Sequence, residues 1–72
     1  MTSHFTTATD IRHHLEDLLA ERSLAGVHGL MDIDAYRADL DAEIAAARSA
    51  YVGAAVTEIA TLRGQLSGRN QG

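Results

Sequence analysis

Four histidines are the residues of this chain best suited to metal binding or acid–base chemistry. They are His4, His13, His14 and His28. Asp10 and His14 are four residues apart, a spacing that puts both on one face of a helix, and His13 and Asp17 share it. Zinc sites need three or four protein ligands, and the spacing places no third ligand beside either pair unless a second subunit supplies one. We therefore interpret the histidines as solvated side chains and predict no metal and no cofactor.

An acidic series forms a second candidate site, at Asp32, Asp39 and Glu43. The spacing i, i+7, i+11 would align the three carboxylates along one side of a helix. Such a row could mimic a line of phosphates or meet a basic partner. The simpler interpretation is a solvated face whose charge complements the helix dipole. We keep these three residues as a candidate acidic partner face.

Tyr36, Arg37 and Arg48 form a third candidate site, a ligand pocket. In an oligomer, a tyrosine ring beside a guanidinium could stack on a nucleobase while the cation binds a phosphate. This arrangement predicts an alternative function, in which the protein binds or sequesters a nucleotide or anion in pockets at subunit interfaces. Packing of Tyr36 in the core is the simpler interpretation.

Catalytic signatures are missing from the sequence. The serines lie in no nucleophile-elbow context, and no glycine-rich phosphate loop is present. The chain has no cysteine, which removes thiolate metal ligands and cysteine nucleophiles together. We predict that the protein is not an enzyme.

The element that must position the acidic series and the candidate ligand pocket is a proline-free stretch over 32–66. Its apolar residues recur in helical steps of three and four, and the pattern repeats every 11 residues at Ile33, Ile44, Ala55 and Leu66. This period of about 3.67 residues per turn is close to that of a relaxed α-helix. We predict a nearly straight helix over 32–66, with Asp32 as its N-cap.

A shorter amphipathic helix is predicted over 10–25, after a flexible lead-in over 1–9. Thr7, in the lead-in, and Asp10, at the start of the helix, resemble a capping box. The connection over 26–31 contains Gly26, which fits the left-handed position past a helix end. So short a connection favours an antiparallel hairpin. Residues 67–72 have the composition of a disordered tail.

The two predicted helices differ in length, at roughly 24 and 52 Å. The short helix can therefore cover the long one only as far as about Tyr51. Leaving the five larger apolar residues beyond it in water would forfeit roughly 7 kcal/mol, comparable to the stability of a small domain. The fold class we predict is all-α: a two-helix antiparallel hairpin completed by homo-oligomerisation into a dimeric four-helix assembly. A helix of another protein is the alternative occupant.

Small side chains are concentrated in the middle of the long helix. Because they would let a second helix approach closely, they predict a helix–helix crossing there. Combined with the uncovered apolar residues, they define the predicted oligomer interface. It consists of Ala46, Ala50, Tyr51, Gly53, Ala55, Val56, Ile59, Leu62 and Leu66.

Composition narrows the classes of partner. The net charge is −4, so nucleic acid and anionic membranes are poor partners, because both are bound mainly through basic residues. No apolar run approaches the ~20 residues of a membrane span, and we expect a cytoplasmic protein. Its basic residues are all arginine and alanine is abundant, a usage typical of GC-rich genomes such as those of actinobacteria and their phages. The leading hypothesis is a non-enzymatic protein–protein interaction module, a small regulatory or phage-type host-directed factor that acts as a homo-oligomer.

Overall fold

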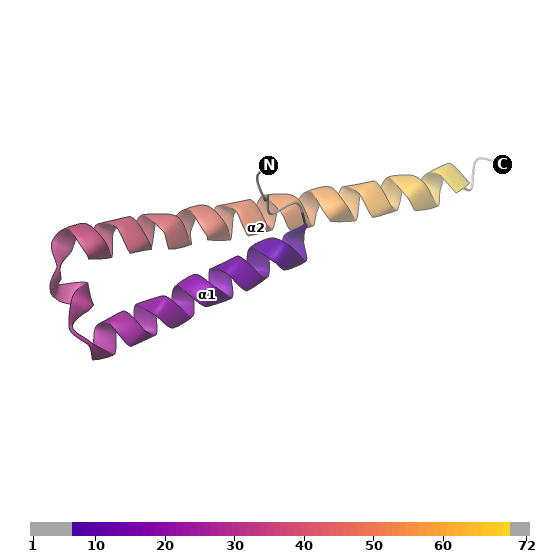
Figure 1. The fold of residues 1–72 in the computed structure, drawn as a ribbon. Helices are drawn as coiled ribbons and strands as arrows, with labels where there is room; N and C mark the ends of the chain where they lie inside the picture. Colours follow the sequence, from indigo (N-terminus) through magenta and orange to yellow (C-terminus); the bar gives the residue numbers. More distant parts are fainter. Residues whose placement is uncertain (1–6, 70–72) are drawn as a thin grey trace, which may run out of the picture.

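The protein is a helical hairpin with one arm much longer than the other (Figure 1). The computed structural model describes residues 7–69, which form helix α1 (Ala8–Val27), a 3-10 turn η1 (Leu30–Asp32) and helix α2 (Asp34–Arg69). With 20 and 36 residues, α1 and α2 extend about 30 and 54 Å. The predicted all-helical hairpin is confirmed, and the C-terminal part of α2 projects beyond α1 (Figure 1).

Helix α1 begins at Ala8, two residues earlier than predicted, because two side chains cap its first amides. The Thr7 hydroxyl Oγ1 accepts from the Asp10 amide at 3.1 Å, which is the bond expected of the capping motif. The Ala8 amide donates to Glu58 Oε2, on α2, at 2.7 Å. The positive end of the α1 dipole therefore meets a carboxylate from the other helix. Of the predicted lead-in, residues 1–6 lie outside the described part of the chain.

The elbow differs from the sequence prediction at its glycines. Gly26 was expected to take the left-handed position, but it lies inside α1, and Gly29 has the positive φ of 78°. Ala25 is only 3% exposed, so packing of the last turn carries α1 past Gly26. Glycine inside a helix costs about 1 kcal/mol relative to alanine, which such packing offsets.

The start of α2 also differs from the prediction. Asp32 was expected to be the N-cap, but it belongs to η1, and α2 begins at Asp34. The Ile33 carbonyl accepts the first helical bond, from the Arg37 amide at 2.9 Å. The extra 3-10 turn lets Met31 pack against the core, and this packing displaces the helix start by two residues.

The core is a short line of apolar side chains between the two helices. Leu18, Leu40, Ile44 and Ala47 are buried together, and Leu15, Met31 and Tyr36 pack against them. All but Met31 recur in the sequence at the helical steps of three and four residues. The contact from Ala8 to Glu58 shows that α1 reaches about two turns further along α2 than the predicted limit at Tyr51.

Beyond this contact α2 continues without a second layer. It was expected to end near Leu66 and to give way to a tail over 67–72, but the helix runs to Arg69. Residues 70–72 lie outside the described range.

Candidate protein-interaction surface

Helix α2 exposes a row of large aliphatic side chains along the part that α1 leaves uncovered. We call this row the aliphatic strip; it consists of Val52, Val56, Ile59, Leu62 and Leu66. Each of these side chains is 54% to 60% exposed. Steps of three and four residues put all five on one side of the helix. A helix normally covers such an apolar side with another element or another protein.

A shallow groove continues this side of the molecule onto the hairpin. It has a volume of about 380 Å³ and is lined by Leu19, Arg22, Asp41, Ile44, Ala45 and Arg48. A second hollow, of about 350 Å³, lies within the strip and is lined by Val56, Ile59, Ala60 and Arg63. The groove has walls from both helices, whereas the hollow is formed by α2 alone.

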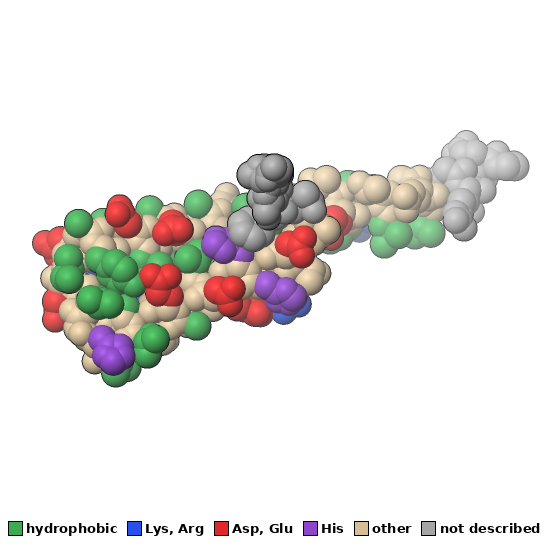
Figure 2. All heavy atoms as spheres, in the orientation of Figure 1, with side chains coloured by type: hydrophobic (Ala, Val, Ile, Leu, Met, Phe, Trp, Pro, Cys, Tyr) green, Lys and Arg blue, Asp and Glu red, His purple; other side chains and the backbone are tan. Residues whose placement is uncertain are grey.

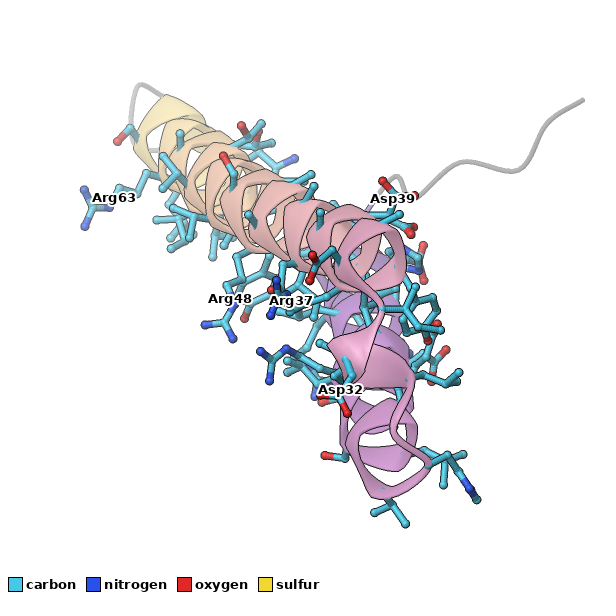
Figure 3. All side chains as sticks on the ribbon, turned by 90° about the vertical axis from the view of Figure 1, so that its left-hand side faces the viewer. Asp32, Arg37, Asp39, Arg48 and Arg63 are labelled. Atoms are coloured by element: carbon cyan, nitrogen blue, oxygen red, sulfur yellow. The ribbon has the colours of Figure 1, made fainter. Side chains whose placement is uncertain are left out.

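Charged side chains separate onto different sides of α2. Figure 3 shows Arg37, Arg48 and Arg63 extending to one side, with Asp39 on the opposite side. Figure 2 views a face on which aspartate, glutamate and histidine gather while almost no basic side chains are visible. The arginines therefore lie on the side that carries the groove and the strip, and much of the negative charge lies away from it.

Three ion pairs within residues 7–69 are solvated. Arg22 Nε lies 2.9 Å from Asp41 Oδ1 and joins the two helices at the groove. Arg12 and Glu16 pair at 3.1 Å within α1, and Arg37 pairs with Asp34 at 3.0 Å within α2. Their side chains are about half exposed or more, and such pairs contribute at most ~1 kcal/mol to stability.

The predicted acidic row is only partly assembled. Asp32 lies in η1 rather than in α2, and Figure 3 shows it well apart from Asp39. Asp39 lies on the side of α2 opposite the arginines, and Glu43 follows it one turn later. The spacing i, i+7, i+11 could align three carboxylates only within a continuous helix, and the 3-10 turn breaks that continuity.

The predicted ligand pocket is not assembled within one chain. The Tyr36 hydroxyl donates to Glu21 Oε2 at 2.6 Å, and this hydrogen bond is the main cause that raises the pKa of Tyr36 above its usual 10.0. Arg37 pairs with Asp34, whereas Arg48 lines the groove. Tyr36 also packs against the core, as the simpler interpretation of the sequence expected.

The predicted oligomer interface is divided between opposite sides of α2. Ala50 and Ile59 are nine residues apart, or about 900° of helix rotation, so they face in opposite directions. Ala46 and Gly53 lie nearer to the Ala50 side, where both are exposed. Tyr51 and Ala55 are half-buried towards α1. A single partner helix therefore cannot cover the small residues and Val56, Ile59, Leu62 and Leu66 together.

The sequence prediction counted Val52 among the uncovered apolar residues but left it out of the interface, and it named as site residues none of seven residues that line the groove or the hollow. These seven are Leu19, Arg22, Asp41, Ile44, Ala45, Ala60 and Arg63. The 11-residue pattern led to Ile44 and Ala55, on the side of α2 near α1, whereas Asp41, Ala45 and Arg63 follow a line that is rotated away from the core. The seven-residue spacing of Ala45, Val52, Ile59 and Leu66 was the signal that could have found this line, and Asp41 and Arg63 lie one turn before Ala45 and one turn after Ile59.

No group of three or more histidine, aspartate or glutamate side chains within residues 7–69 is placed to hold a metal ion. His14 is half-buried, His13 is exposed and His28 caps the end of α1, while His4 lies outside the described residues. Neither α1 nor α2 contains a stretch that is apolar and long enough to cross a bilayer.

Comparison with known proteins gives no relative: no family model, no curated protein and no solved structure matches the chain.

Proposed function

We propose that this protein is a non-enzymatic helical interaction module that acts as a homo-oligomer, with a dimer as the basic unit. The observation that supports it is the aliphatic strip, in which five large side chains stand in a row at more than half exposure. Self-association through this side leaves the acidic face turned outward, where it is free to meet another protein.

The size of the strip supports a partner that is present most of the time. Full burial of a Val, Leu or Ile side chain contributes about 1.5–3 kcal/mol, and roughly half of that is still to be gained here. The five side chains together would then contribute about 5 kcal/mol per chain, comparable to the stability of a small domain. Two strips in a dimer double this term, which can offset the entropic cost of association.

The outward acidic face supports a regulatory role towards a basic partner. Asp39 lies on α2 away from the arginines, and Glu43 follows it by one helical turn. A surface of one sign accelerates association with an oppositely charged protein and disfavours partners of like charge. We therefore propose a small regulatory factor, of the host-directed type that phages encode, with a basic protein surface as its target.

Thermal unfolding at several protein concentrations tests the oligomer. Because folding is then coupled to association, the midpoint measured by circular dichroism rises as the chain concentration rises. A midpoint that stays constant over a hundredfold range of concentration would remove the basis for the proposal.

A second candidate function uses the groove as a binding site for a nucleotide or other anion. The specific observation in its favour is that Arg22 and Arg48 both line the groove beside the apolar surface of Leu19. Nucleotides should then raise the melting temperature of the parent chain and not that of an Arg48→Ala variant. If no nucleotide raises the parent melting temperature, this second function is excluded and the first is unaffected.

A further inference from the structure

The α2 residues that line the groove and those that line the hollow are placed symmetrically about Val52. Asp41 and Arg63 lie eleven residues before and after it, and the other pairs lie eight, seven and four residues away. These pairs are Ile44 with Ala60, Ala45 with Ile59, and Arg48 with Val56. Two antiparallel helices that cross at a two-fold axis bring such pairs face to face. The groove of one copy would therefore meet the hollow of the other.

Side chains in these pairs are complementary in size. Ile59 faces Ala45 at seven residues from Val52, and the same symmetry sets Leu62 opposite Ala42 and Leu66 opposite Ala38. Three of the five large side chains of the strip thus meet an alanine on the first half of the partner helix, whereas Val52 meets its own copy and Val56 meets Arg48. Alternation of large and small side chains lets two helices approach closely and interdigitate.

Their charges are complementary as well. Arg63 would face Asp41, whose Oδ1 accepts from Arg22 Nε at 2.9 Å. The Asp41 side chain is 45% exposed, and its second oxygen can accept from another guanidinium. The two-fold axis makes this contact twice in each dimer.

We propose that two copies of this chain pair antiparallel along α2, with the two-fold axis at Val52, so that the strip of each copy covers the groove side of the other. This inference rests on the self-association proposed above and adds the polarity and the register of the contact. The paired segment, residues 38–66, is about 42 Å long. Val52 follows Ala47 by five residues, which is about 140° around α2, so the second copy and α1 occupy different sides of the helix.

Other pairings lack this complementarity. A shift of one heptad towards the C-terminus sets Arg48 opposite Arg63, a contact between like charges. The opposite shift carries Leu66 past the beginning of α2, to a position opposite Met31 in η1. A parallel pair in register sets Ile59 against Ile59 and Arg63 against Arg63, and it leaves Ala45 facing only another alanine.

Disulfide trapping tests the polarity and the register in a chain that has no cysteine of its own. Single variants Ala45→Cys, Ile59→Cys and Val52→Cys are oxidised separately, and the first two are also oxidised as a mixture. A disulfide needs Cα atoms within about 7 Å, which only facing positions satisfy. We expect Val52→Cys to cross-link to itself, and the mixture to give at least fivefold more covalent dimer than Ala45→Cys or Ile59→Cys oxidised separately.

Two results would overturn the pairing and leave the proposed function intact. Self-cross-linking of Ala45→Cys as fast as that of the mixture would show a parallel pair. A mixture that does not cross-link, although sedimentation finds dimers, would show a different register. If sedimentation finds only single chains of the parent protein, the pairing and the proposed function fail together.

Charge reversal gives a second test that needs no change in an apolar residue. Asp41→Arg or Arg63→Asp creates two like-charge contacts in its own homodimer, and we expect dissociation constants at least tenfold higher. Mixing the two variants restores both contacts, so the mixed dimer should bind nearly as tightly as the parent. Asp39→Arg, on the opposite side of α2, is the matched control. If the mixture dissociates as readily as the single variants, the Asp41–Arg63 contact does not exist.

Discussion

Replacement of Ile59 by aspartate should weaken self-association sharply without unfolding the hairpin. Ile59 is 54% exposed and lies at the centre of the strip, beyond the buried core of Leu18, Leu40, Ile44 and Ala47. Within one chain the new carboxylate would remain in water and would disturb little. In a dimer it would be placed against the apolar surface of the second copy.

The expected size of the effect follows from the exposure. About half of the side chain remains to be buried, so its removal costs about 1 kcal/mol per chain and about 2 kcal/mol per dimer. Desolvation of two carboxylates adds at least as much. A total near 4 kcal/mol corresponds to an increase of about a thousandfold in the dissociation constant.

Sedimentation velocity over a range of concentrations measures this constant directly, and circular dichroism checks that helix content is retained. Thr61→Asp is the matched control, because it adds the same charge two residues away, at an exposed position about 200° around α2. The control should dimerise like the parent chain. If Ile59→Asp and Thr61→Asp change the dissociation constant equally, the strip is not the contact surface.

Three further substitutions test the hairpin itself. Gly53→Ala should raise the free energy of unfolding, measured with urea, by about 1 kcal/mol, because alanine favours the helix and a Cβ there meets no atom within 4 Å. A loss of stability would instead indicate a close helix crossing at Gly53. Glu58→Ala should lower the free energy of unfolding by about 1 kcal/mol, because it removes the acceptor of the Ala8 amide. The control Glu43→Ala, at an exposed position, should have little effect. Equal effects of the two substitutions would refute a capping role for Glu58. The hydrogen bond to Glu21 raises the folded-state pKa of Tyr36, so the stability that this bond contributes is complete below pH 10 and is lost as the pH rises through that pKa. Tyr36→Phe should therefore lose less stability than the parent chain between neutral and strongly alkaline pH. An equal loss in both proteins would contradict this role.

The hairpin was predictable because the spacing of its apolar residues specifies two amphipathic helices. Leu40, Ile44 and Ala47 recur at helical spacing, and all three are buried. The ends of the elements were less predictable, because contacts distant in sequence fix them. Glu58 accepts the first amide of α1 from a position 50 residues away, and Met31 packs on the core and moves the start of α2.

The candidate surface was harder to predict than the fold. Sequence reasoning recognised that the far end of α2 lacks cover, and Ile59, Leu62 and Leu66 are exposed there. It could not separate the side of α2 that α1 occupies from the side that remains open, because this depends on how the hairpin closes. Ala50 and Gly53 were therefore grouped with residues on the opposite side of the helix.

Sedimentation equilibrium of the unmodified chain is the most direct test of the claim that α2 is completed by a second copy. From low to high micromolar concentration, the average mass should rise from the 7.7 kDa of one chain to twice that value and remain there. A mass that stays at 7.7 kDa up to high micromolar concentration would mean that the aliphatic strip remains in water, and that a partner of this kind does not exist.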